Sequence, residues 1–303
     1  MRGKGHVFTT SDLAKRQGFL DNYIRPPFGD MDPRELAGRS IDDALIRAVK
    51  KNGKPLAMAT KYKIHYNFNL LLEDLVERKI LAANPLMGIR PFSKAPEEPR
   101  GAIPRDALLK LFPTPHADIL AVWGSQMWVA AFLVLLETGM RPGELRALRW
   151  CELYGEERAF VIRHGIQEGT SATIKGTKND SVKAGSISLR TAQELAIWRS
   201  VSLYSGDDDF ILTRNGKAPI TNDGIRRAFV SGLAAVGLEA ERWTPYWLRH
   251  SFVTYSLGAL SEEEVALLAG HSVEVDRIYQ HPDDELALAR SKAARGKLDA
   301  ARG

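Results

Sequence analysis

Apolar and polar residues repeat with helical spacing through the first ninety residues of the chain. Residues 9–24 begin with Thr, Ser and Asp, which cap helices, and then place Leu, Phe and Tyr near one face. Residues 40–53 start at a Ser, carry acidic residues in the first turn and end in Lys-Lys-Asn-Gly, a typical helix stop. A longer amphipathic run follows at residues 59–80. The pattern predicts a helical domain over residues 1–90.

Proline then interrupts this pattern. Residues 90–108 hold four prolines among mixed charges, and a proline inside a helix removes a backbone hydrogen bond. We therefore expect a linker at residues 91–104, followed by a second domain over residues 105–303 that ends in a helical tail.

The second domain combines apolar helices with a few short strands. Residues 117–139 are apolar nearly all round, which predicts a buried helix, and residues 141–150 predict a new helix. Short strands are predicted at 158–165, 171–175 and 185–189, and the polar turn 176–184 joins the last two. Later helices are predicted at 191–201, 221–237, 244–259, 261–270 and 284–303. The expected fold is mainly α with a small antiparallel β-sheet.

Positive charge is concentrated in the first domain. Residues 1–100 hold 18 Lys and Arg against 12 Asp and Glu, whereas the other 203 residues carry 24 against 25. Within the first domain a cluster surrounds a turn and the start of the next helix, formed by Lys50, Lys51, Lys54, Lys61 and Lys63. Such a cluster can bind phosphates along a groove, and its alternative role is that of a solvated helix face.

Other classes of protein are disfavoured by composition. A single cysteine, Cys151, excludes a disulfide framework and a cysteine-based zinc site, and it fits a reducing cytoplasm. No apolar run reaches the ~18–20 residues that span a bilayer, and the N-terminus lacks the apolar core of a signal peptide. We expect a cytoplasmic protein without a membrane partner.

The groups that remain for chemistry suit a phosphodiester. The sequence contains no HExxH pair, no GxSxG elbow, no GxxxxGK[ST] loop and no carboxylate cluster spaced for two metals. Cleavage without a metal needs arginines to neutralise the phosphate, a nucleophile such as a Tyr hydroxyl, and a proton donor such as Lys. The chain supplies each kind of group, in Arg141, Lys178, Arg249, His250, His271 and Tyr279.

The surroundings of these residues resemble the tyrosine recombinases of the phage integrase family. The stretch "LLETGMRPGELRALRW" (135–150) is similar to the family's first signature box, and "TPYWLRHSFVT" (244–254) to its second. The closing segment "LLAGHSVEVDRIYQH" (267–281) is similar to the part that carries the nucleophile. Residues 173–189 resemble the family's β2–β3 hairpin, and residues 10–90 its helical, SAM-like core-binding domain.

The resemblance implies a role for each matching residue. Arg141, Arg249 and His271 would stabilise the charge of the scissile phosphate, and Glu144 would support the site. Tyr279 would attack the phosphate and form a covalent 3′-phosphotyrosyl link. No metal and no nucleotide cofactor is expected.

The proton donor and one departure from the family pattern complete this assignment. The resemblance places the catalytic lysine in the hairpin, where Lys178 is preferred and Lys175 is the alternative. The second box begins with Tyr246 where the family has a histidine. A phenol with a pKa near ~10 is a poor base at neutral pH, so we expect an altered rate. His250 is expected to point away from the site and not to replace that histidine.

The expected function is site-specific recombination or integration of double-stranded DNA. The resemblance implies a homotetramer on paired sites and a monomer or dimer off DNA. Accessory DNA-bending proteins are possible further partners. A nucleoid-associated location and a place on a mobile element are also expected. The alternatives are a type IB topoisomerase-like relaxer or resolvase, and a catalytically weak DNA-binding protein. The Ala-rich segment 286–303 is hypothesised to dock on a neighbouring protomer. The family's N-terminal arm-binding domain has no counterpart before residue 10, so either the protein lacks one or the sequence begins after it.

Overall fold

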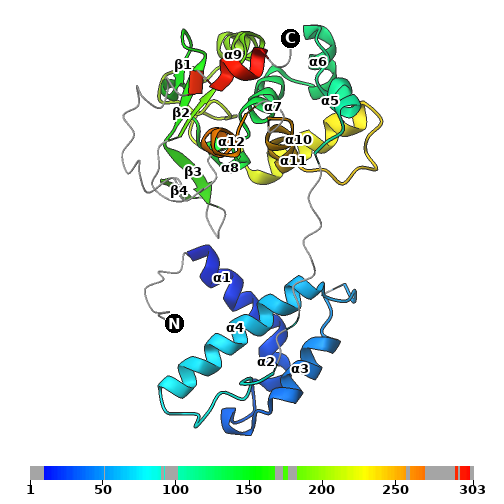
Figure 1. Ribbon diagram of the computed structural model, residues 1–303, viewed down its shortest axis with the longest axis vertical. Coiled ribbons are helices and arrows are strands. Elements are labelled where there is room, and N and C mark those ends of the chain that lie inside the picture. The colour runs from blue at the N-terminus through cyan, green and yellow to red at the C-terminus, as the bar shows by residue number, and fades with distance from the viewer. Residues whose placement is uncertain are drawn as a thin grey trace. The chain divides into compact units, whose positions relative to one another are not determined.

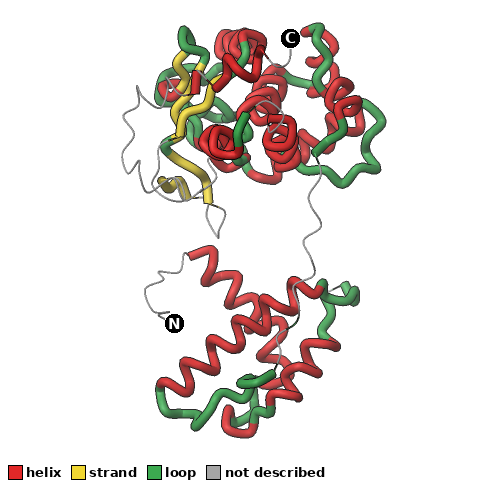
Figure 2. The backbone as a smooth tube through the Cα atoms, viewed as in Figure 1, coloured by secondary structure: helices red, strands yellow, loops and turns green. Residues whose placement is uncertain are grey.

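The computed structural model divides the chain into two compact units, one that contains Met1–Pro99 and one that contains Arg100–Gln167 and Ala172–Gly303 (Figure 1). The structure describes residues 10–50, 52–89, 92, 102–167, 173–176, 183–256, 260–269, 291–292 and 294–300. Most of these residues are helical, and the strands are short and confined to the second unit (Figure 2). The expected fold class, mainly α with a small antiparallel sheet, is confirmed.

The first unit is built only of helices in its described part. They are α1 (Thr10–Phe19), α2 (Arg25–Phe28), α3 (Gly38–Arg47) and α4 (Met58–Glu77), with a π-helical turn at Leu20–Ile24. The longest, α4, buries an apolar stripe at Ile64, Phe68 and Leu72, four residues apart, against Ile41 and Leu45 of α3. This stripe is the amphipathic pattern predicted for residues 59–80.

The second unit is centred on helix α7 (Gln126–Thr138). Ten of its thirteen residues are buried, and it lies among α6, α8, α9 and α11. The helices of this unit are α5 (Arg105–Leu111), α6 (His116–Trp123), α7, α8 (Pro142–Ala147), α9 (Leu189–Val201), α10 (Asn222–Ala235), α11 (Tyr246–Ser256) and α12 (Glu262–Ala269). No single helix in the described part of the chain is long and apolar enough to cross a membrane, and α6 and α7 reach that length only as a pair bent by 97°.

Two small antiparallel sheets flank these helices. Strand β2 (Ala159–Ile162) lies between β1 (Leu153–Tyr154) and β5 (Lys183–Ser186). Strand β3 (His164–Gln167) pairs with β4 (Thr173–Gly176). The single strand predicted at 158–165 is therefore split at Arg163 into two strands that belong to different sheets.

The register fixes where the chain leaves this ribbon and where it returns. Gly176, the last residue of β4, faces His164, and Lys183, the first residue of β5, faces Ile162. Residues 177–182 therefore connect two points that are adjacent to Arg163 on the facing strand. Strand β5 begins two residues earlier than predicted, so Lys183 belongs to a strand and not to the polar turn.

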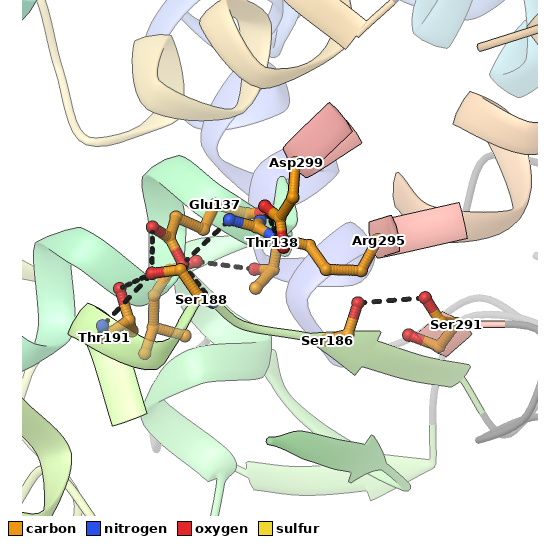
Figure 3. A network of polar contacts seen from close by, with 9 residues as sticks. Glu137, Thr138, Ser186, Ser188, Thr191, Ser291, Arg295 and Asp299 are labelled. Carbon is orange, nitrogen blue, oxygen red and sulfur yellow. Dashed lines mark hydrogen bonds and ion pairs between the residues drawn. The ribbon is translucent and has the colours of Figure 1, made fainter. Parts of the chain in front are cut away.

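The C-terminal residues that the structure describes pack on their own chain. Ala294 and Leu298 are buried with apolar side chains of α11 and α12. Arg295 forms ion pairs with Glu137 of α7 and with Asp299 (Figure 3). Docking of the segment 286–303 on a neighbouring protomer stays a prediction, because one chain alone cannot test it.

Candidate active site

Arg141 stands at a turn between two helices whose geometry requires glycine. Helix α7 ends at Gly139, which has a left-handed φ of 62°, and a Cβ at this position would lie 2.3 Å from the ring of Phe252. Two residues later Arg141 precedes Pro142, the first residue of α8. Gly143 then lets α8 approach β3, since a Cβ there would lie 2.8 Å from the carbonyl oxygen of Ile166. The Thr-Gly-Met-Arg-Pro-Gly sequence thus fixes the position of Arg141.

Glu144 holds Arg141 at this turn through both of its carboxylate oxygens. Its Oε2 accepts the backbone N–H of Arg141 at 2.8 Å, and its Oε1 accepts the guanidinium Nη1 at 2.9 Å. The first contact caps the N-terminus of α8. The side chain of Glu144 is 6% exposed and that of Arg141 is 34% exposed, so the guanidinium reaches the surface. Glu144 therefore holds both the backbone and the guanidinium of Arg141.

Lys183 is a third charged residue at this site, and the sequence interpretation missed it. Its ammonium donates to Oε1 of Glu144 at 2.8 Å, and its side chain is only 10% exposed. The available signal was a lysine followed by the apolar run of a strand, but the residue was assigned to the preceding polar turn. The carboxylate of Glu144 is thus shared between Arg141 and Lys183.

Arg249 lies on α11 and is 2% exposed. Its Nη1 donates to the carbonyl of Gly139 at 2.5 Å and to the carbonyl of Ala269 at 2.6 Å. Gly139 begins the turn that carries Arg141, and Ala269 ends α12, two residues before His271 in the sequence. Arg249 therefore joins the Arg141 turn to the point where the chain enters the segment of His271 and Tyr279.

The charges of this cluster act on one another. Burial raises the pKa of Glu144, but Lys183 and Arg141 outweigh burial, so the pKa lies below its ordinary value. Burial lowers the pKa of Lys183, and the positive charges of Arg141 and Arg249 add to this effect against the opposing Glu144. The pKa of Arg249 is lowered by burial and by Arg141. Three cations are therefore gathered around one carboxylate, which leaves an excess of positive charge for an anion.

Tyr246 begins α11 on the same side as Arg249. The guanidinium of Arg249 donates a hydrogen bond to the hydroxyl oxygen of Tyr246, which opposes the lowering of the Arg249 pKa, so the two side chains are close. The rings of Tyr246 and His250 meet edge to face with their centroids 5.1 Å apart. His250 thus shares a helix face with Tyr246, four residues earlier, and its expected orientation away from the site stays a prediction.

Three expected catalytic residues lie outside the described part of the chain. They are Lys178, His271 and Tyr279. The alternative lysine, Lys175, belongs to β4, but its side chain also lies outside that part. The described ends of both segments are nevertheless at the cluster, since Lys183 contacts Glu144 and Ala269 contacts Arg249.

The lysine cluster of the first unit differs in part from the expectation. Lys50 and Lys54 are exposed and close a turn through the 2.8 Å bond from the N–H of Lys50 to the carbonyl of Lys54. Lys63 is exposed, and Lys51 lies outside the described residues. Lys61 is 8% exposed, and its ammonium donates to the carbonyl of Ile46 in α3 at 2.6 Å. Lys61 therefore has a structural contact in place of the expected surface position.

Two solved integrase structures share this architecture. The Tn1549 transposon integrase in complex with a circular intermediate DNA matches with a TM-score of 0.71 and 17% identity over 96% of this chain and 95% of that chain. A lambda integrase dimer bound to a COC′ core site matches with a TM-score of 0.62 and 14% identity over 92% of this chain and 91% of that chain. These likenesses define the fold.

Sequence comparison gives the family. Residues 106–285 match the model of the phage integrase family, so the chain belongs to this family of tyrosine recombinases. An integrase of Streptomyces ambofaciens is 24% identical over 272 residues, which are 82% of this chain and 65% of that protein. The tyrosine recombinase XerC of Pediococcus pentosaceus is 28% identical over 162 residues, 52% of this chain and 50% of that protein. The chain spans less than two thirds of the length of either relative.

Proposed function

We propose that the protein cuts and rejoins DNA at specific sites as a tyrosine recombinase. The observation that carries this proposal is the gathering of Arg141, Arg249 and Lys183 around Glu144, at the two points where the chain enters or leaves the segments of Lys178 and Tyr279. A scissile phosphate carries the negative charge that such a cluster attracts, and its transition state carries more. Membership of the phage integrase family supports the same reaction.

In this mechanism the hydroxyl of Tyr279 loses its proton to solvent, and its oxygen attacks the phosphorus and forms a 3′-phosphotyrosyl link. The bond to the 5′ oxygen breaks, and Lys178 gives that oxygen a proton. Arg141 and His271 bind the non-bridging oxygens. Arg249 is buried, so we assign to it two roles that need no exposed guanidinium. Its positive charge acts on the phosphate from the protein interior, and its hydrogen bond positions Ala269. Attack by the 5′ hydroxyl of a partner strand on the phosphotyrosine then rejoins the DNA and frees Tyr279.

We assign Tyr246 the role of a hydrogen-bond donor to the phosphate. Its position at the start of α11, beside Arg249, supports this role, and its contact with His250 limits the orientation of the ring. A phenol hydroxyl can donate a hydrogen bond to a phosphate oxygen, but it is a poor general base.

Double-stranded DNA is the proposed partner, and we expect the first unit to bind it in addition to the catalytic domain. The exposed lysines 50, 54 and 63, with Lys51, support phosphate binding by the domain 1–90, and the linker 91–104 would join it to the catalytic domain. The structural neighbours include integrases on DNA, among them a lambda integrase tetramer bound to a Holliday junction. We extend this to a homotetramer on paired sites, to action on a mobile element and to a cytoplasmic location.

The test uses covalent trapping. The full chain is incubated with a pool of nicked duplexes of randomised sequence, and DNA that stays attached to denatured protein is recovered and sequenced. We expect an adduct at a preferred site with the wild type and none with Tyr279→Phe. Site binding without an adduct would favour a DNA-binding protein. Relaxation of a plasmid that lacks the site, without strand exchange between two sites, would favour a topoisomerase-like relaxer. The family match supports neither rival.

A further inference from the structure

Lys183 occupies a position from which it can affect two parts of the active site. It is the residue at which the chain re-enters the sheet after residues 177–182, which include Lys178. Its backbone faces Ile162 of β2, and its side chain reaches across to Glu144 of α8. The ion pair between Lys183 and Glu144 is therefore a direct link between the end of that connection and the helix that follows Arg141.

The contact is suited to fixing geometry because it is shielded from water. The side chains of Lys183 and Glu144 are 10% and 6% exposed, and their charged atoms are 2.8 Å apart. Charge pairs in such surroundings are screened less than surface pairs, and loss of one partner leaves the other buried without compensation. The same Oε1 also holds Nη1 of Arg141 at 2.9 Å, so a change at Lys183 is transmitted to Arg141 through one atom.

The groups that face this carboxylate come from several elements. Lys183 is on β5, Arg141 precedes α8, and Arg249, whose charge interacts with that of Glu144, is on α11. Strand β3 packs on α8 through Gly165, whose added Cβ would lie 3.7 Å from Cγ of Glu144. The titratable side chain of that strand, His164, approaches Glu152 instead. The groups that shift the pKa of Glu144 are thus Lys183 and Arg141, and neither β3 nor α10 supplies one of them.

We propose that Lys183 is a positioning residue for strand cleavage: its ammonium holds the Glu144 carboxylate, which holds Arg141 and fixes the end of the Lys178-bearing connection. The proposal rests on the proposed function, since it concerns the rate of the tyrosyl attack. Lys183 acts through Glu144 and does not itself contact the DNA. Lys178 remains the proton donor.

The test measures single-turnover adduct formation by the full chain on a nicked duplex of the selected site, at saturating DNA. We expect Lys183→Met to slow the reaction by about 10- to 100-fold, the scale of a misplaced catalytic group. Lys183→Arg, which can still pair with Glu144, should restore most of the rate. Lys110→Met is the matched control, because Lys110 is an exposed lysine of α5, and it should react as the wild type does.

The pH dependence separates positioning from a general loss of structure. Lys183 is the strongest of the groups that lower the pKa of Glu144, so Lys183→Met should raise that pKa. Glu144 then becomes protonated, and releases Arg141, at a higher pH than in the wild type. The acidic limb of the cleavage rate should therefore move to higher pH in Lys183→Met. This acidic limb should be absent both in Glu144→Gln and in Glu144→Gln/Lys183→Met.

A double variant covers the case in which Lys183→Met does not fold. Glu144→Gln/Lys183→Met removes both buried charges, and the proposal predicts that it cleaves at the rate of Glu144→Gln. A double variant that is slower by a further factor of about 10 would mean that Lys183 acts on the DNA directly, which contradicts the proposal. Equal rates and equal acidic limbs for Lys183→Met and the wild type would also overturn it. Absence of an adduct with the wild type would instead refute the proposed function.

Discussion

Among the residues that the structure describes, Lys61 of the first unit and Lys183 of the second are largely shielded from water, and the two lysines meet different partners. In the first unit, Lys61 is 8% exposed and donates to the carbonyl of Ile46, in the last turn of α3. In the second unit, the side chain of Lys183 is 10% exposed and pairs with Glu144, which also binds Arg141. The partner of Lys61 is a carbonyl at the end of a helix, whereas the partner of Lys183 is a carboxylate that also binds a second cation.

The partner of a buried charge, more than its burial, indicates a functional site. A lysine at a helix C-terminus donates hydrogen bonds to carbonyls that the helix leaves unpaired, and its charge is stabilised by the negative end of the helix dipole. Such a contact is complete in itself. A carboxylate shared by two cations, with Arg249 nearby, leaves net positive charge that an incoming phosphate can compensate.

The largest expected effect comes from removing the shared carboxylate. Glu144→Leu leaves Lys183 buried without its partner, and we expect the second unit to lose about 3–5 kcal/mol of stability. Tryptophan fluorescence during thermal unfolding measures this unit alone, because all six tryptophans follow residue 122. Cleavage at saturating DNA should fall by about 100-fold or more.

The control for this variant is Glu194→Leu. Glu194 is also a buried carboxylate of the second unit, but its hydrogen-bond partners are His116 and Gln126 and not Arg141 or Lys183. We expect lower stability with a normal cleavage rate for the folded protein. Equal cleavage by Glu144→Leu and Glu194→Leu would erase the proposed difference between structural and functional buried charges.

A smaller effect is expected from Lys61→Met. The carbonyl of Ile46 loses a charged donor, so the first unit should lose about 1–2 kcal/mol. Far-UV circular dichroism follows the unfolding of both units. In this signal the unfolding of the first unit should move to a lower temperature, while the transition seen by tryptophan fluorescence stays in place. The cleavage rate at saturating DNA should not change. A rate loss as large as that of Lys183→Met would show that Lys61 also serves the reaction.

The two units should also differ in their response to acid. Burial lowers the pKa of His65, on α4 of the first unit, against the opposing charge of Asp42. The unfolded chain therefore takes up a proton more readily, and the first unit should lose stability as the pH falls below about 6.5. The depressed pKa of Glu144 stabilises the second unit above about pH 4.3, and this contribution is lost only as the pH falls through the lower folded value.

Thermal unfolding at a series of pH values measures this difference. The circular dichroism transition should begin to fall between pH 7 and pH 5, before the tryptophan transition does. His65→Leu should remove most of that early change. Parallel acid sensitivity of both transitions in the wild type would contradict the assignment.

The smallest effect concerns the exposed lysines of the first unit. Lys50→Ala/Lys54→Ala should weaken DNA binding and reduce the slope of log K against log salt by about 0.9 for each phosphate that the variant no longer neutralises. Lys61→Met should leave the slope unchanged, because its ammonium is buried. An equal change of slope in both variants would place Lys61 on the DNA.

Sequence reasoning recovered the parts of the site that local chemistry determines. Gly139, Pro142 and Gly143 each have a backbone reason for their positions, so the turn that carries Arg141 could be predicted. The roles of Lys183 and Lys61 could not, because each depends on a partner from another element. A lysine in a polar run looks solvated until the fold brings a carboxylate or a helix end to it. The contact between Tyr246 and His250 follows from their four-residue spacing, which places both rings on one face of α11.

The central claim is that Tyr279 is the nucleophile, and peptide mapping tests it most directly. The trapped adduct is digested with nuclease and trypsin, and the peptide that retains a nucleotide is identified by mass spectrometry. We predict the modification on Tyr279, in the peptide 278–290. A nucleotide on Tyr246, in the peptide 243–249, or on any other residue would contradict this claim.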